Sequence, residues 1–104
     1  MNNMRNTQDL ISAAVPLYVG YGITPFPKED GERLVREFGP EVGRQLELKV
    51  KQVLGELDQL KPDWSAHTLV SASRWAGTEL SDRHPELDAK AVAALEWIFS
   101  WWWK

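Results

Sequence analysis

The chain has 104 residues, of which 43% are hydrophobic and 26% are charged, and its formal net charge is −3. This length and composition exclude a largely disordered chain and predict one folded domain with a hydrophobic core, covering residues 1–104. The absence of cysteine excludes disulfides, thiolate metal ligands and a cysteine nucleophile. We expect residues 1–5 to be disordered.

The distribution of charge argues against a nucleic-acid partner. Binding to a phosphate backbone needs clustered Lys and Arg, whereas here these residues are dispersed among acidic ones, as in EDGERLVREF at residues 29–38. The N-terminus does not resemble a signal peptide, because Asp9 directly precedes its apolar stretch. No apolar run approaches the roughly 20 residues that cross a bilayer. We therefore expect a cytoplasmic location.

Apolar residues recur at helical spacing along most of the chain, and alternating strand patterns are nearly absent. We expect an all-α fold, a compact five-helix bundle. The predicted helices cover approximately residues 7–21, 28–38, 41–60, 64–80 and 85–103.

The first two predicted helices are followed by breaks that the sequence marks clearly. Pro16 is expected to project from the face opposite the apolar stripe of the first helix and to bend it. Gly39 and Pro40 separate the second helix from the third. The stripe of the first helix consists of Leu10, Ile11, Ala14, Leu17, Tyr18 and Tyr21.

The third predicted helix has the clearest amphipathic pattern, broken only by Leu48 on its polar side. Asp63 is expected to cap the fourth helix, and Ser81 or Asp82 the fifth, with Pro85 in the first turn. We expect the third and fifth helices to be the longest. The apolar stripe of the third helix contains Val42, Leu46, Val50, Val53, Leu54, Leu57 and Leu60.

The segment WIFSWWWK, residues 97–104, contains four of the six tryptophans. A helical wheel at about 100° per residue places Trp101, Trp102 and Ile98 on the face that packs into the core. We therefore expect this segment to be docked on the bundle and the fifth helix to be largely buried.

Trp97, Phe99 and Trp103 do not share that face. The favoured interpretation is a central fifth helix that other helices cover on both sides. The alternative is that these three residues contact a partner, because tryptophan is enriched at binding hot spots. Anchoring to a membrane surface is disfavoured, because the polar side of the helix is not rich in Lys and Arg.

Polar residues form one stripe on the fourth predicted helix. His67, Ser71, Arg74 and Thr78 follow helical spacing, and Arg74 suits a carboxylate or phosphate ligand. The stripe is either the solvent-facing side of the helix, which is favoured, or the floor of a binding groove. Ser71 as a nucleophile with His67 as its base is strongly disfavoured.

Two further groups of residues have a functional and a structural interpretation. His84 with Asp82 or Asp88 would supply part of a metal site, but the spacing matches no known motif, so a solvated turn is favoured. Tyr18, Tyr21 and the PFP segment at residues 25–27 would form either a peptide-binding loop or, as favoured, a loop packed on the bundle.

The leading functional hypothesis is a non-enzymatic protein-binding module, such as an adaptor, an inhibitor or an immunity-type protein. Its partner would be another protein or a second copy of the chain, and no cofactor or catalytic residue is assigned. The alternative is a helical bundle, or an enzyme, with a small-molecule pocket beside residues 64–80. That pocket would be lined by Trp64, Trp75, Trp101, His67 and Arg74.

Overall fold

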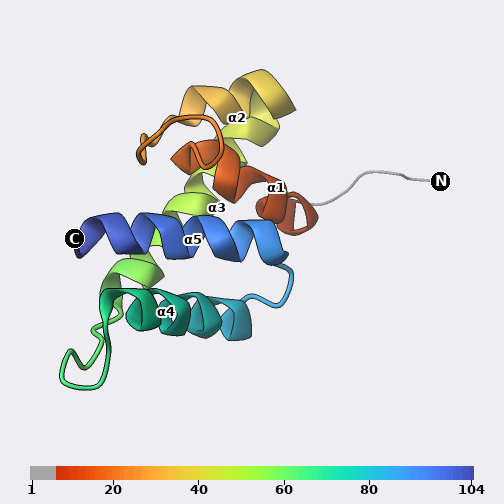
Figure 1. Ribbon diagram of the computed structural model, residues 1–104. Helices are drawn as coiled ribbons and strands as arrows, with labels where there is room; N and C mark the ends of the chain where they lie inside the picture. The colour runs from red at the N-terminus through yellow and green to blue at the C-terminus, as the bar shows by residue number, and fades with distance from the viewer. Residues whose placement is uncertain (1–6) are drawn as a thin grey trace.

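The computed structural model describes residues 7–104, with side chains described from Leu10 onward. It contains five helices: α1 (Thr7–Val19), α2 (Gly31–Phe38), α3 (Pro40–Gln59), α4 (Leu69–Arg83) and α5 (Ala89–Trp102). Because no β-strand occurs in the described residues, the predicted all-α fold with five helices is confirmed (Figure 1). The disorder predicted for residues 1–5 lies outside the described residues.

Two helical hairpins, α2–α3 and α4–α5, make up most of the bundle, and α1 packs against both of them. In Figure 1, α1 and α2 lie at the top, α4 lies at the bottom, and α5 crosses in front of α3. The core lies where these elements meet. Its largest fully buried side chains are Val15, Val19, Leu34, Leu46, Val50, Leu57, Leu80, Leu95, Ile98 and Phe99.

Helix α1 is buried over a wider arc than its predicted stripe. Pro16 is buried, together with Val15 and Val19, so the prediction that Pro16 faces away from the core is wrong. Both hairpins contact α1, and a helix packed on two sides buries more than one stripe. Helix α1 ends at Val19 because Gly20 adopts a φ of 88°, a left-handed backbone conformation that residues other than glycine rarely adopt. Just beyond this end, the Arg33 guanidinium donates hydrogen bonds to the backbone carbonyls of Leu17, Tyr18 and Lys28.

Helix α2 begins at Gly31, three residues later than predicted, because Asp30 caps it by accepting a hydrogen bond from the Glu32 N–H. Helix α3 follows after Gly39 and begins at Pro40, as the break in the sequence indicated. Gly43 allows the two helices to approach closely, since a Cβ added there would lie 2.6 Å from the Cα of Val35.

The start of α4 differs most from the prediction. Thr68, not Asp63, is the N-cap, because its side chain and that of Ser71 form a reciprocal capping box. Asp63 instead accepts hydrogen bonds from the N–H and hydroxyl of Ser65 in a turn of the preceding loop. Residues 64–68 therefore lie outside the helix, which places Trp64 on a loop.

Helix α4 continues to Arg83, past the predicted caps of the fifth helix, and Asp88 caps α5 by accepting from the Ala91 N–H. With 20 residues, α3 is the longest helix, as predicted, but α5 has 14 residues and α4 has 15. Helix α5 is largely buried, as predicted, because it packs against α4, α1 and α3. Among the described residues, no helix is both long and apolar enough to span a membrane.

Candidate functional site

Three consecutive tryptophans at the end of α5 are exposed. Trp101, Trp102 and Trp103 each have a relative exposure of 38%. Two more exposed aromatic residues come from loops, Phe26 from the α1–α2 connection and Trp64 from the α3–α4 connection. Both loops lie beside the C-terminal end of α5 (Figure 1). We call these five residues the aromatic end.

Ring contacts connect most of the aromatic end. The ring centroids of Phe26 and Trp101 are 6.4 Å apart, and those of Trp64 and Trp103 are 5.4 Å apart, both pairs being tilted. Trp103 also lies 6.2 Å from the ring of the buried Phe99. Such geometries are favourable for aromatic pairs. Trp102 has no aromatic partner in the described part of the chain, so its indole contributes surface without a ring contact of its own.

Two lysines lie over indole rings of the aromatic end. The Nζ of Lys104 is 3.8 Å from the ring centroid of Trp101, and the Nζ of Lys61 is 5.6 Å from that of Trp103. Both distances fall within the range of cation–π interactions. Among the side chains of residues 10–104, neither ammonium forms an ion pair with a carboxylate. The aromatic end therefore has a positive rim, although the chain as a whole is acidic.

The prediction that Trp101 and Trp102 face the core is wrong. By rotation around α5, Trp102 lies on the same side as the buried Leu95 and Ile98. The difference is its position along the helix axis, because the last turn of α5 extends beyond the first turn of α4 (Figure 1). At this level α4 no longer lies alongside α5, and Trp102 keeps a relative exposure of 38%.

The three residues predicted to contact a partner occupy three different environments. Phe99 is 0% exposed, which agrees with the favoured interpretation of a fifth helix covered on both sides and not with the alternative of a partner contact. Trp97 is half-buried and packs against Tyr21, with ring centroids 5.4 Å apart. Only Trp103 belongs to the exposed aromatic end. The contacts of α5 with three other helices widen its buried arc beyond one face and thereby enclose Phe99.

The predicted polar stripe on the fourth helix does not form one continuous site. His67 precedes α4, and its Nδ1 lies 3.0 Å from the Oγ of Ser71. Ser71 is engaged in the helix cap, where the N–H of Thr68 donates to its Oγ at 3.0 Å. Arg74 lines a groove between α4 and α5, whereas Thr78 is exposed one turn further along. The structure thus pairs His67 with Ser71 but separates both from the groove.

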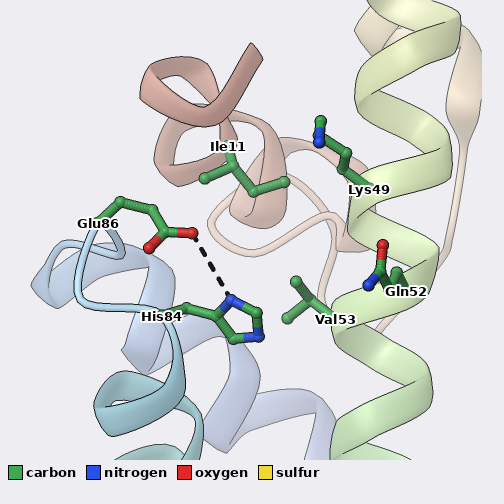
Figure 2. A pocket seen from close by; sticks show the side chains of 6 residues that line it. All are labelled: Ile11, Lys49, Gln52, Val53, His84 and Glu86. Atoms are coloured by element: carbon green, nitrogen blue, oxygen red, sulfur yellow. Dashed lines mark ion pairs between the residues drawn. The ribbon is translucent and has the colours of Figure 1, made fainter. Parts of the chain in front are cut away.

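His84 contacts two glutamates rather than the predicted Asp82 or Asp88. Its Nε2 lies 3.0 Å from the Oε1 of Glu56. Its Nδ1 lies 3.6 Å from the Oε2 of Glu86, the ion pair drawn as a dashed line in Figure 2. Asp88 caps α5, and Asp82 is exposed. Within the described residues no group of three or more His, Asp or Glu side chains is arranged to hold a metal ion.

A hollow of about 250 Å³ lies beside His84, between α1, α3 and the turn that leads into α5 (Figure 2). Ser12 of α1 holds this turn, since its hydroxyl donates to the carbonyl of Glu86 at 2.8 Å and accepts from the N–H of Asp88 at 2.7 Å. The hollow is lined by Ile11, Lys49, Gln52, Val53, His84 and Glu86.

The aromatic residues at the end of α1 and in the following loop differ in burial, because some pack on the bundle and one is exposed. Tyr18 is buried and donates a hydrogen bond to Glu29 at 3.3 Å. Burial, with the nearby Glu29 carboxylate, raises the pKa of Tyr18 to about 12. Tyr21 packs on Trp97, whereas Phe26 remains exposed in the aromatic end.

A groove with a volume of about 470 Å³ lies between α4 and α5. Of the residues predicted to line a pocket here, only Arg74 does so. His67 and Trp75 face one another with ring centroids 5.8 Å apart, and Trp64 and Trp101 belong to the aromatic end. The remaining walls come from side chains that the sequence analysis did not single out for this role, Glu96 among them.

Comparison of the chain with protein-family models, with curated proteins and with solved structures yields no match. No residue therefore acquires a role from a relative. The aromatic end and the α4–α5 groove are the two features whose geometry supports a functional proposal.

Proposed function

We propose that this protein is a small binding module that docks onto another protein through the aromatic end. The observation that carries the proposal is the exposure of Trp101, Trp102 and Trp103 at one end of the bundle. A folded monomer seldom leaves a cluster of large apolar side chains in water, and such clusters mark interaction surfaces. Tryptophan is also the residue most enriched at interface hot spots.

Intramolecular contacts support the proposal because they pre-organise much of this surface. Trp101 packs on Phe26, and Trp103 packs on Trp64 and Phe99, so these rings lose little freedom when a partner covers them. A surface whose side chains are already ordered incurs a smaller entropic cost on association. Trp102 is as exposed as its two neighbours but lacks such a ring contact, so its indole is free to enter a pocket on the partner without breaking an aromatic pair.

The charges around the aromatic end favour a different protein over a second copy of this chain. In a two-fold symmetric dimer the patch faces its own copy, so the ammonium groups of Lys61 and Lys104 from both copies would border one interface. Like charges placed together at an interface are unfavourable. A partner with an apolar pocket rimmed by Asp or Glu complements both the indoles and the ammonium groups.

The test compares Trp102→Ala with Leu48→Ala, which removes a more exposed apolar side chain from the polar side of α3. Leu48 is 70% exposed. Partners captured by the full-length protein are purified and titrated directly by calorimetry. We expect Trp102→Ala to weaken binding about 30-fold or more, as is typical of a hot-spot residue, and Leu48→Ala to leave the affinity within about twofold.

Two other measurements decide between occupants of the aromatic end. Light scattering after size exclusion would assign the surface to a second copy if it gave a dimer that Trp102→Ala dissociates. Co-sedimentation with vesicles of anionic lipid, abolished by the same substitution, would assign it to a membrane surface. Either result, or a purified partner bound equally well by both variants, would overturn the proposal.

A further inference from the structure

The groove between α4 and α5 contains opposite charges on its two facing helices. Arg74 of α4 and Glu96 of α5 both line it, and no ion pair joins them in the described structure. Leu69 and Val70 supply apolar surface from α4, and Tyr21 and Trp97 supply aromatic surface. The groove is thus apolar between a cationic group and an anionic group.

The carboxylate of Glu96 is half-buried, and no hydrogen bond from another described residue reaches it. Burial raises its pKa above the ordinary value of 4.5, while the charge of Arg74 acts in the opposite direction. The missing side chain of Gly77 on α4 leaves room for the Glu96 carboxylate, since a Cβ added at Gly77 would lie 2.5 Å from the Oε2 of Glu96. A partly desolvated carboxylate in such a place gains strongly from a cationic ligand.

Aromatic rings in the same groove add a second feature that suits an ammonium group. Tyr21 and Trp97 lie in the same groove with ring centroids 5.4 Å apart and planes inclined by 57°. An ammonium group held by a carboxylate and placed against aromatic faces gains cation–π stabilisation as well as the ion pair.

Arg74 argues against a ligand that is only cationic. Its guanidinium is exposed on the opposite wall, where it would repel a simple amine but would bind a carboxylate through two parallel hydrogen bonds. A ligand with an ammonium and a carboxylate at a short separation satisfies both walls at once.

The geometry points to the α4–α5 groove as a binding site for a free α-amino acid with an apolar side chain. The ammonium group lies at Glu96 against Trp97 and Tyr21, the carboxylate lies at Arg74, and the side chain lies on Leu69 and Val70. Because the groove is open, the expected dissociation constant is weak, on the order of millimolar. This site goes beyond the proposed docking of a partner protein and does not depend on it.

The experiment titrates the full-length protein with L-leucine and follows backbone and indole N–H signals by NMR. The comparison ligands are N-acetyl-L-leucine, which lacks the ammonium group, and L-leucinamide, which lacks the carboxylate. We expect L-leucine to cause saturable shifts at Trp97 and in the adjoining parts of α4 and α5. Each modified ligand is expected to bind about tenfold more weakly, because each loses one charged contact.

Two substitutions assign the two contacts. Glu96→Gln keeps the shape of the side chain and is expected to weaken L-leucine binding about tenfold, whereas the control Glu79→Gln, on α4 but outside the groove, leaves it unchanged. Arg74→Gln is expected to weaken L-leucine binding while leaving the binding of L-leucinamide unchanged. Circular dichroism checks that each variant is folded.

The absence of saturable shifts, or shifts confined to residues outside the groove, would overturn the proposal. It would equally fail if Glu96→Gln, correctly folded, bound L-leucine as tightly as the unaltered protein. Partner binding through the aromatic end is measured with Trp102→Ala, so failure of either proposal leaves the other open to its own test.

Discussion

The middle of α5 and its last turn are built from similar apolar residues but lie in opposite environments. Leu95, Ile98 and Phe99 are enclosed by three neighbouring helices, whereas Trp101, Trp102 and Trp103 are exposed. The direction in which a side chain points does not explain this contrast, because Trp102 shares the side of Leu95. Burial in a short bundle depends on where the neighbouring helices end as much as on helical rotation.

The largest expected difference in stability is between two variants, each replacing one aromatic residue of α5 by alanine, one in the buried middle and one in the exposed last turn. Phe99→Ala should lower the free energy of unfolding by about 3–5 kcal/mol, since it leaves a cavity in the core. Trp102→Ala should lower it less, by about 1–2 kcal/mol, because the residue is only partly covered and lacks an aromatic partner among the described residues. Urea denaturation followed by circular dichroism measures both; equal losses would contradict the contrast.

Two glycines of α3 extend the same comparison to another helix. Gly43→Ala should cost about 1–3 kcal/mol, because the new methyl group meets the backbone of α2. Gly55→Ala should instead stabilise by about 0.4–1 kcal/mol, because nothing lies near the added Cβ and alanine favours the helix. Thermal melting shows whether each variant is more or less stable than the unaltered protein. Destabilisation by Gly55→Ala would mean that another part of the chain covers this position.

A smaller effect is expected at the cap that sets how far α4 extends along α5. Thr68→Ala removes the side chain that accepts from the Ser71 N–H and should cost about 1 kcal/mol. Amide hydrogen exchange should show faster exchange in the first turn of α4 and unchanged exchange in α3. Thr78→Ala, on the exposed side of the same helix, serves as the control. Unchanged exchange at the start of α4 would show that packing alone fixes this boundary.

The smallest expected effect is a dependence of stability on pH that comes from Glu96, a partly buried residue of α5. Because burial raises the pKa of Glu96, the folded state holds its proton to a higher pH than the unfolded state does. As the pH rises from the ordinary glutamate pKa through the raised one, the protein should therefore lose stability relative to Glu96→Gln. Urea titrations of both proteins across this pH range measure the difference. A constant difference would show that the carboxylate is not desolvated.

Local patterns in the sequence predicted the helices well and their ends less well. The stripe on α3 is regular enough to fix the buried side, and Leu48 is exposed as its position indicated. Helix starts were misplaced where two capping residues compete. Asp63 and Thr68 are both good N-caps, and only the reciprocal contact between Thr68 and Ser71 selects the second.

The candidate sites depend on contacts between distant segments, which helical periodicity does not reveal. The groove joins Arg74 to Glu96 and Trp97 only because α4 and α5 lie side by side. Of the five residues predicted to line a pocket there, only Arg74 lines this groove. The aromatic end depends on where the neighbouring helices stop, so rotation around α5 wrongly assigned Trp101 and Trp102 to the core. Gly77, which makes room for Glu96, could have signalled this close approach.

The contacts of Ser12 have a consequence for how the chain folds during synthesis. Its hydroxyl joins α1 to Glu86 and Asp88, which follow Ser12 by 74 and 76 positions in the sequence. Helix α1 also packs against α5. Pairing such distant segments is a slow step in folding, and exposed apolar surface promotes aggregation until it is complete. The part of α1 that packs against α5 therefore stays uncovered on the nascent chain until α5 has left the ribosome, even though α2 and α3 can already pack against the rest of the helix.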